Sequence, residues 1–363
     1  MPKTLVASLI FTLISGQLTY AQESYTYSQP TQLEDAWSTD KLGSQGIDSA
    51  LIYQLFNQLQ AADHQLHSVL IVRNHQLVLE EYFGDHDFHQ LHDLRSASKS
   101  IRSILLGIAL DQGFIDDIND PISKYLDSPV PRKNLDQRKQ EITIRHLITM
   151  STGLDCHDWD KKSKGQEDRV YKKKDWLQYI LDLPLIHAPG EVSHYCSMGV
   201  VLMVEVISQA SGMPINEFAH EYLFKPLGMT RVEWGHTSRG EVIASGKRLY
   251  MTPRDMAKIG QLILNKGKWE GKQIVSAAWV EESTTPQTNI TGVDYGYLWW
   301  NIPFSFHGKP LISRTAMGNG GQYIMIFPEL DLVAVFTGGA YNSPDDKLPF
   351  NIVGDVILPS VEH

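Results

Sequence analysis

The stretch "LRSASKSIRSILLGIAL", from Leu94 to Leu110, joins a polar start to an apolar run. After the lysine, apolar residues recur at the spacing of one helix face, and Gly113 follows as a terminator. The pattern therefore predicts a helix near 98–112. Ser96 and Lys99 then lie one turn apart at its N-terminal end, on the same face.

The spacing of Ser96 and Lys99 has two interpretations. A serine needs a base to become nucleophilic, and a lysine can act as that base once it has lost its proton. Burial and the positive end of a helix both favour that loss, and the same helix end favours a developing oxyanion. However, an S-x-x-K match by itself is most often a capped, solvated helix start. These four residues alone do not decide between catalysis and capping.

The composition of the chain is that of a globular protein with material for a large core. The 363 residues are 42% hydrophobic and 20% charged. A formal net charge of −10 argues against a general electrostatic attraction to nucleic acid or to anionic membranes. We therefore expect a small-molecule substrate, no nucleic-acid partner and no stable membrane insertion. The oligomeric state is left open.

The N-terminus has the features of an export signal. Lys3 precedes the apolar run "LVASLIFTLISG", and "TYA" offers small residues before a cut after Ala21. The alternative is a membrane anchor, but the run is too short to span a bilayer comfortably. We expect a signal peptide over 1–21 and a soluble exported protein, periplasmic or secreted.

The order of the expected elements is strands, then helices, then strands. Helical patterns occur near 48–62, 98–112, 143–150, 175–182, 197–211, 214–223 and 249–267, a hairpin lies within 67–84, and strands fall within 294–302, 316–330 and 330–339. This order predicts an α/β (α+β) fold, with an antiparallel sheet closed by both ends of the chain and flanked by helices. After an extended tail at 22–45, one domain covers 46–363. Its α/β part is about 46–93 and 235–363, and its mostly helical inserted part is about 94–234.

Two further stretches carry polar residues in front of regular structure. Tyr195 and Ser197 precede a strongly apolar helix, and "NGGQ", residues 319–322, stands at the head of a strand. Glycines at a strand end suggest close approach by a ligand, although a strand bulge would also explain them. Tyr195 alone would equally be a packed loop aromatic. Cys156 and Cys196, the only cysteines, would form either a disulfide or two isolated buried thiols.

Taken together, these stretches resemble the serine β-lactamase and penicillin-binding-protein superfamily. The likeness is to its class C β-lactamase-like branch, which includes esterases and 6-aminohexanoate-oligomer hydrolases. Ser96-Ala97-Ser98-Lys99 matches the S-x-x-K motif, Tyr195-Cys196-Ser197 the Tyr-x-Asn motif, and Asn319-Gly320-Gly321 the K-T-G motif. The segments "HLITMSTGL", "EYLFKPLGM", "DMAKIGQLILNKGKWEGKQIVS" and "YGYLWW" also resemble the family, over roughly residues 46–355.

The resemblance implies a serine hydrolase that works through an acyl-enzyme and needs no metal or organic cofactor. Ser96 would be the nucleophile, and Lys99 would take its proton, alone or through Tyr195. Ser197 would hydrogen-bond within this proton network. The backbone N–H groups of Ser96 and Gln322 would form the oxyanion hole.

The third motif departs from the penicillin-recognising members of the superfamily. Those members carry a cation where this chain has Asn319, followed by Gly320 and Gly321. Asparagine donates hydrogen bonds but brings no charge to a substrate carboxylate. We therefore expect a carboxyl-ester, amide or peptide-like substrate. A true β-lactamase, a D-alanyl-D-alanine carboxypeptidase and a non-catalytic penicillin-binding-like sensor are the alternatives.

Aromatic residues and histidines near these motifs raise two further questions. The aromatic residues in loop-like stretches are Trp159, Trp234, Tyr295, Trp299 and Trp300. We expect core packing for most of them, with Trp299 and Tyr323 most worth testing as substrate contacts. The histidines of "GDHDFHQLHD", His86, His89 and His92, suggest a metal hydrolase, but neither H-x-H-x-D-H nor HExxH occurs. An exposed polar loop without a metal is the expectation here.

Overall fold

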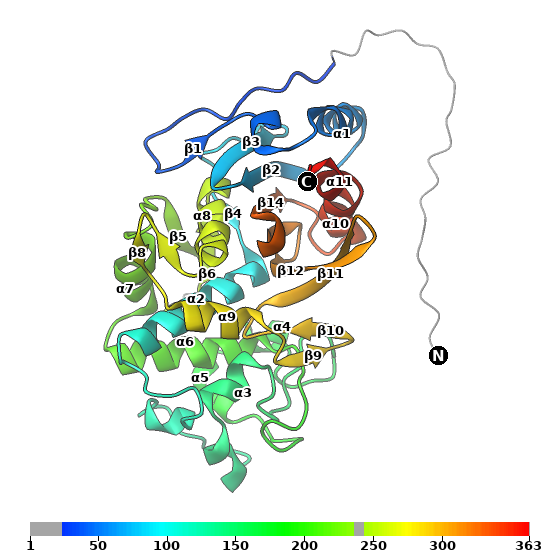
Figure 1. The fold of residues 1–363 in the computed structure, drawn as a ribbon. Coiled ribbons are helices and arrows are strands. Elements are labelled where there is room, and N and C mark those ends of the chain that lie inside the picture. The colour runs from blue at the N-terminus through cyan, green and yellow to red at the C-terminus, as the bar shows by residue number, and fades with distance from the viewer. Residues whose placement is uncertain (1–23, 236–242, 363) are drawn as a thin grey trace.

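The computed structural model describes residues 24–235 and 243–362 (Figure 1). The expected signal peptide, 1–21, lies outside the described residues. The α-helices are α1 (Ser49–Ala61), α2 (Ser98–Asp111), α3 (Ile144–Ile148), α4 (Glu167–Val170), α5 (Trp176–Leu181), α6 (Ser197–Ser211), α7 (Ile215–Ala219), α8 (Pro253–Leu264), α9 (Ala277–Thr284), α10 (Leu348–Ile352) and α11 (Leu358–Ser360). The strands are β1 (Ser38–Thr39), β2 (Leu66–Arg73), β3 (Gln76–Tyr82), β4 (His92–Asp93), β5 (Val232–Gly235), β6 (Arg248–Met251), β7 (Lys268–Trp269), β8 (Lys272–Gln273), β9 (Thr288–Ile290), β10 (Val293–Tyr295), β11 (Trp300–Phe306), β12 (Lys309–Gly318), β13 (Gln322–Phe327) and β14 (Leu332–Gly338).

One large sheet joins the two ends of the chain. Its nine strands follow the order β1-β3-β2-β14-β13-β12-β11-β10-β9, and every pair is antiparallel except β1 with β3. The junction is between β14 and β2, where Val333 pairs with Val72. This confirms the expected mixed α and β fold, with a mainly antiparallel sheet that both chain ends close.

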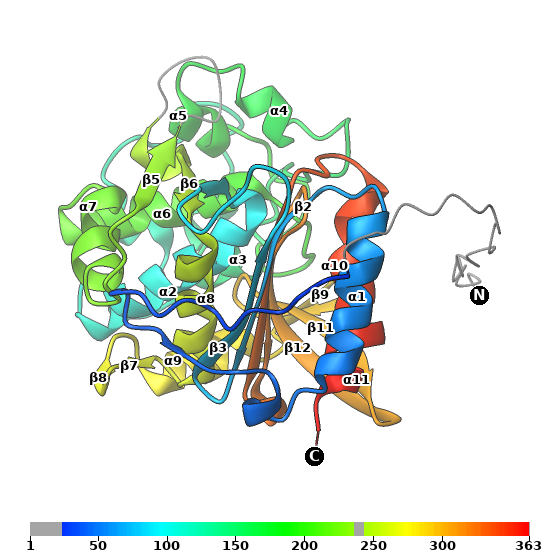
Figure 2. The same cartoon turned by 90° about the horizontal axis from the view of Figure 1, so that it is seen from above.

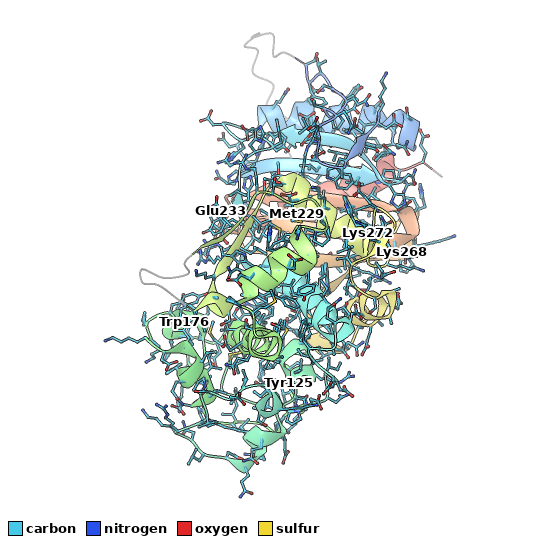
Figure 3. All side chains as sticks on the ribbon, turned by 90° about the vertical axis from the view of Figure 1, so that its left-hand side faces the viewer. Tyr125, Trp176, Met229, Glu233, Lys268 and Lys272 are labelled. Atoms are coloured by element: carbon cyan, nitrogen blue, oxygen red, sulfur yellow. A yellow bond between two sulfur atoms is a disulfide. The ribbon has the colours of Figure 1, made fainter. Side chains whose placement is uncertain are left out.

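Helices cover both faces of this sheet, which Figure 2 shows nearly edge-on. Alternate residues of β2 face opposite sides, as the two-residue period of a strand requires. Leu70 and Val72 pack in the core that also holds α2, α6 and α8. Val69 and Ile71 face the second core, which α1, α10 and α11 cover. The helical part packs against the first of these two faces, and Figure 3 labels Trp176 and Tyr125 among its side chains.

Helix α2 lies in the centre of the first core. The structure confirms the helix expected near 98–112, and its residues from Ser98 to Ala109 are all buried. It contacts α6, α9 and β12, so neighbours surround it on several sides. Polar residues on this helix find backbone partners: Ser100 Oγ donates to the carbonyl of Leu298, and Arg102 donates to that of Lys247. The residues just before α2 are therefore held on a rigid support.

Two segments differ from expectation. The residues at 24–45 are mostly extended, but they are docked rather than a loose tail: Trp37 is buried and donates from Nε1 to the carbonyl of Arg254. The expected strand at 294–302 is interrupted, since β10 ends at Tyr295 and β11 begins at Trp300. The interruption is a tight turn in which the N–H of Gly296 donates to the carbonyl of Trp299.

No helix in the described part of the chain is by itself long and apolar enough to cross a membrane. Helix α6 and the helical stretch Ile215–Phe224 pass that test only as a pair, and the pair is bent by 80°.

Candidate active site

Ser96 lies in a short 3-10 turn, Arg95–Ala97, that runs directly into α2. The turn begins with Arg95 at a φ of 50°, and the N–H of Ala97 donates to the carbonyl of Leu94. Ser96 is partly exposed, while Lys99 is buried. Nζ of Lys99 lies 2.9 Å from Oγ of Ser96, within hydrogen-bond distance. The structure thus brings together the pair that the helical spacing predicts.

Tyr195 lies beside the same lysine. Nζ of Lys99 is 4.9 Å from the centre of the Tyr195 ring, which is itself buried. Trp159 stacks on that ring, with the ring centres 4.9 Å apart and the planes 2° from parallel. Trp300 lies against the ring at 5.8 Å. The ring of Tyr195 therefore lies beside Lys99 and is fixed in orientation by aromatic packing.

The serine and the lysine open onto a cleft of about 100 Å³. Its lining residues are Arg95, Ser96, Ser98, Lys99, Arg102, Glu167, Tyr171, Trp176, Ser197, Met198, Val201, Gly246, Lys247, Arg248 and Asn319. This wall is largely polar, and it is built from the turn before α2, the start of α6, the β6 region and the end of β12. Ser96 and Lys99 therefore share one polar cleft.

Ser197 makes its hydrogen bonds with a residue that sequence reasoning missed. Both its backbone N–H (2.8 Å) and its Oγ (2.6 Å) donate to Oδ2 of Asp158. The other carboxylate oxygen, Oδ1, is buried without a hydrogen-bond partner. Burial raises the pKa of Asp158 to about 6, although the positive charge of Lys99 opposes that rise. Asp158 is thus the link from Ser197 to Lys99, and no motif in the loop marks it.

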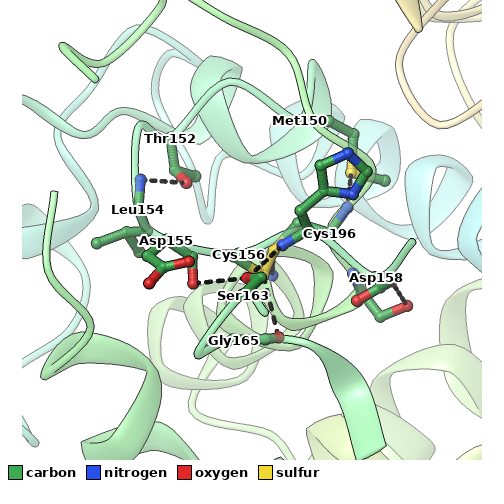
Figure 4. Close-up of a disulfide and its surroundings, with 12 residues drawn as sticks. Met150, Thr152, Leu154, Asp155, Cys156, Asp158, Ser163, Gly165 and Cys196 are labelled. Atoms are coloured by element: carbon green, nitrogen blue, oxygen red, sulfur yellow. Dashed lines mark hydrogen bonds between the residues drawn. A yellow bond between two sulfur atoms is a disulfide. The ribbon is translucent and has the colours of Figure 1, made fainter. Parts of the chain in front are cut away.

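A disulfide fastens the loop of Asp158 to that of Tyr195 (Figure 4). Cys156 and Cys196 are bonded, with their Cα atoms 5.5 Å apart. Beside the bridge, the N–H of Asp158 donates to the carbonyl of Tyr195. Cross-linking residues that are 40 apart constrains the unfolded chain, an effect of about 4 kcal/mol in the chain-entropy treatment. Of the two arrangements that the sequence left open, the bridge is the correct one.

The glycine-rich segment lies against the nucleophile turn. A Cβ added at Gly318 would lie 2.2 Å from the carbonyl oxygen of Leu94, so only glycine permits this approach. Gly320 and Gly321 have φ near +94° and +93°, and a Cβ on Gly320 would meet the ring of Tyr341 at 2.5 Å. The glycines therefore serve close contacts within the protein, in a sharp turn between β12 and β13.

Gln322 is the first residue of β13, and this strand contacts the Arg95–Ala97 turn. The side chain of Gln322 is buried, and its Nε2 donates to the carbonyl of Gly338. Only its backbone N–H is thus left for the oxyanion role that the resemblance implies. Asn319 is held by Asn342: its Nδ2 donates to Oδ1 of Asn342 at 2.8 Å, and its Oδ1 accepts from the N–H of Asn342.

A family model described as "Beta-lactamase" matches residues 54–351 of the chain. This chain belongs to the beta-lactamase family. It is 23% identical to the 6-aminohexanoate-dimer hydrolase of Paenarthrobacter ureafaciens, over 80% of this chain and 76% of that one. It is 24% identical to the D-alanyl-D-alanine-carboxypeptidase/endopeptidase AmpH of Escherichia coli K12, over 66% and 69% of the two chains. A solved beta-lactamase/D-alanine carboxypeptidase from Pseudomonas syringae has the same fold, with a TM-score of 0.65 at 14% identity over 87% and 99% of the chains.

The aromatic residues of this beta-lactamase-family protein mostly pack in the core, as expected: Tyr295, Trp299 and Trp300 are buried. Trp299 and Tyr323, the two most worth testing as substrate contacts, are fully buried and belong to the core. Tyr323 packs in the second core, on the far face of the sheet from α2. Trp159 is 53% exposed and stacks on Tyr195, while the aromatic residues that line the cleft are Tyr171 and Trp176.

The expectation for the histidine loop holds for only one residue of three. His89 is exposed. His86 is partly buried, and His92 is buried in β4. The segment 83–91 is not helical, so the three-residue spacing does not place these rings on one face.

Asp158→Asn is expected to change how the stability of this beta-lactamase-family protein depends on pH. The folded-state pKa of about 6 exceeds the ordinary 3.8, so protonated Asp158 stabilises the fold below about pH 4. That contribution is lost as the pH rises through 6. The difference of about two pKa units corresponds to up to about 3 kcal/mol. Urea unfolding at pH 4.5 and 7.5 should show the wild type losing stability relative to Asp158→Asn. Asp160→Asn, an exposed neighbour, is the control, and parallel curves for wild type and Asp158→Asn would contradict the assignment.

Proposed function

We propose that the protein is a serine hydrolase that cleaves carboxyl esters or amides through an acyl-enzyme. The observation that carries this proposal is the 2.9 Å contact between Lys99 Nζ and Ser96 Oγ at the mouth of a polar cleft. Such a pair, with a nucleophile in reach of its base, is the signature of covalent catalysis. Membership of the family and the neighbouring Tyr195 ring support the same interpretation.

In the proposed acylation step, Oγ of Ser96 attacks the substrate carbonyl carbon and its proton passes to Lys99, directly or through Tyr195. The backbone N–H groups of Ser96 and Gln322 bind the oxygen that becomes negative. When the tetrahedral intermediate collapses, the bond to the leaving alcohol or amine breaks, and that group takes a proton from the Tyr195–Lys99 pair. Water, activated by the same pair, then hydrolyses the acyl-enzyme and frees Ser96.

Asp158 and Ser197 assist this proton transfer through their effect on Lys99. Lys99 becomes positively charged when it takes the proton of Ser96, and the carboxylate of Asp158 lies close enough to interact with that charge. Because the interior around them screens charge weakly, the attraction stabilises the protonated lysine. Ser197 holds the carboxylate in place through its two hydrogen bonds. Both residues act through Lys99 and are positioning residues.

For the substrate, we propose a neutral ester or a linear amide. Asn319 supplies no charge at the third motif and is tied to Asn342. One of the relatives is named a hydrolase of 6-aminohexanoate dimer, a linear amide that itself ends in a carboxylate. A β-lactam or D-alanyl peptide, whose carboxylate would need a cation in the cleft, is the second candidate, because Arg95 and Arg248 also line the cleft. Both guanidinium groups pair with Asp93, at 3.0 and 2.9 Å, which neutralises much of their charge.

A substrate panel with active-site labelling tests the proposal. The purified protein would be assayed with short p-nitrophenyl esters, nitrocefin, a D-alanyl-D-alanine peptide and aminohexanoate dimer, each with and without EDTA. We expect ester or amide turnover that EDTA does not reduce, and one phosphonate adduct on the peptide that contains Ser96. Fast nitrocefin turnover would favour the β-lactam or D-alanyl class. Labelling without any turnover would favour a sensor, and turnover without labelling of Ser96 would overturn the mechanism.

We also propose that the protein is exported. The apolar N-terminal run and the small residues before position 22 support cleavage after Ala21. The disulfide supports it too, because such bonds persist in oxidising compartments. N-terminal sequencing of protein from its native host should begin at Gln22.

A further inference from the structure

We propose that His67, His86 and His92 form a binding site for a zinc-type divalent metal ion beside the active site. They come from three separate segments: His67 from β2, His86 from the 83–91 loop and His92 from β4. One nitrogen from each ring can be chosen such that all three lie within 4.8 Å of one another. Within residues 24–235 and 243–362, no other three histidine, cysteine or carboxylate side chains bring their ligand atoms this close together.

The distances fit a metal better than they fit hydrogen bonds. Nδ1 of His67 lies 3.4 Å from Nδ1 of His92, which is longer than the usual 2.7–3.2 Å. In a tetrahedral zinc site with Zn–N distances of about 2.0–2.1 Å, two ligand nitrogens lie about 3.3 Å apart. The observed separation therefore matches one edge of such a site. The chosen nitrogen of His86 lies within 4.8 Å of the other two, and its ring stacks on that of His67 with centres 3.7 Å apart.

The surroundings of each ring leave nitrogens free for a metal. Nδ1 of His86 lies 2.8 Å from Oε1 of Gln90, and since that oxygen can only accept, the ring donates through Nδ1. Its Nε2 then carries a lone pair, as in metal sites where the second ring nitrogen is held by an acceptor. On His92 the ligand atom is Nδ1, the nitrogen that lies 3.4 Å from His67, while its Nε2 is buried without a hydrogen-bond partner.

The ligand set of the cluster also selects a class of cation. Three imidazoles with no carboxylate ligand suit zinc, copper or nickel and do not suit magnesium or calcium. Three ligands also leave a fourth position for water.

The site lies next to both halves of the catalytic apparatus. His92 precedes Ser96 by four residues, and the intervening Asp93 accepts from the N–H of Arg95. On the other side, a Cβ added at Gly339 would lie 2.8 Å from Nε2 of His67. The preceding residue, Gly338, holds the side chain of Gln322. A metal ion would therefore join β2, the 83–91 loop and β4, and stabilise the segments that carry the nucleophile and the oxyanion strand.

Metal titration of purified, untagged protein tests this proposal. Calorimetry with Zn²⁺ should show one site, and saturating Zn²⁺ should raise the Tm by about 5 °C, with no rise from Mg²⁺. His86→Ala, which removes the most accessible of the three ligands, should weaken zinc binding at least about 100-fold and abolish the Tm rise. His89→Ala, an exposed histidine of the same loop, should bind zinc like the wild type.

Two further variants test whether zinc binds at these three histidines and not elsewhere on the chain. Ser96→Ala should keep full zinc affinity, which makes the result independent of the proposed hydrolase mechanism. A second group of rings, His157, His187 and His194, has centres 4.7 and 5.7 Å apart. Zinc binding that is lost with His194→Ala but kept with His86→Ala would overturn the proposal, as would the absence of zinc binding to the wild type.

Discussion

Ser96→Ala is expected to lower kcat/KM by at least about 10³-fold on every ester or amide that the wild type hydrolyses. Without Oγ no acyl-enzyme can form, and the cleft retains only its ability to bind the substrate and polarise its carbonyl group. The fold should be unaffected, because Ser96 is partly exposed and its hydrogen-bond partner given by the structure is Lys99. The measurement is steady-state hydrolysis of the best substrate from the panel, with thermal unfolding alongside.

Ser100→Ala is the matched control for this prediction. Ser100 lies four residues further along, is buried, and donates to the carbonyl of Leu298. Its loss should cost about 1 kcal/mol of stability and leave kcat within a few-fold of the wild type. If Ser96→Ala retained full activity, or if both variants lost it equally, Ser96 could not be the nucleophile.

Lys99→Met is expected to lower kcat by about 10²–10⁴-fold while changing KM little. Methionine keeps much of the length and apolar volume of the side chain but has no group that can take the proton of Ser96. The buried surroundings of Lys99 should accept it, so the Tm should not fall sharply. Rapid-mixing kinetics on a p-nitrophenyl ester should show that the acylation burst slows along with turnover.

Lys247→Met separates the role of a base from the effect of positive charge in the cleft. Lys247 also lines the cleft, but within the described residues its side chain makes no hydrogen bond to Ser96. We expect this variant to retain most of its kcat. A comparable loss in both lysine variants would mean that cleft charge, and not proton transfer, explains the result for Lys99.

The local features of the site could be predicted from the sequence because they depend on helix geometry. Helical spacing predicts Ser96 and Lys99 one turn apart, and the 3-10 turn that carries Ser96 runs directly into α2 and keeps them close. The polar loop before α6 likewise locates Tyr195. By contrast, Asp158 lies 39 residues before Ser197, in a loop whose path is set by the disulfide and by packing. No periodicity or spacing could reveal that contact.

The histidines show the same difference between what local spacing predicts and what the tertiary structure brings together. Their spacing in the chain suggested that His86, His89 and His92 belong together, but the helix required for this does not form. Instead, the first hairpin brings His67, 25 residues before His92, against the loop. For Gly320 and Gly321 the sequence left ligand approach and a strand bulge open, and the structure adds that Gly320 packs against the ring of Tyr341. In each case the partner comes from another part of the fold.

By itself, the sequence determined the helix that positions Ser96 and Lys99 and the strands of the last third, because these depend on contacts between near neighbours in the chain. It also determined the family, through motifs in a fixed order. The tertiary structure decided the rest: the pairing of β14 with β2, the approach of Asp158 to Lys99, and the convergence of three histidines. These contacts join distant segments, and their geometry is set by how the sheet and its helices pack together and not by any local preference of the chain.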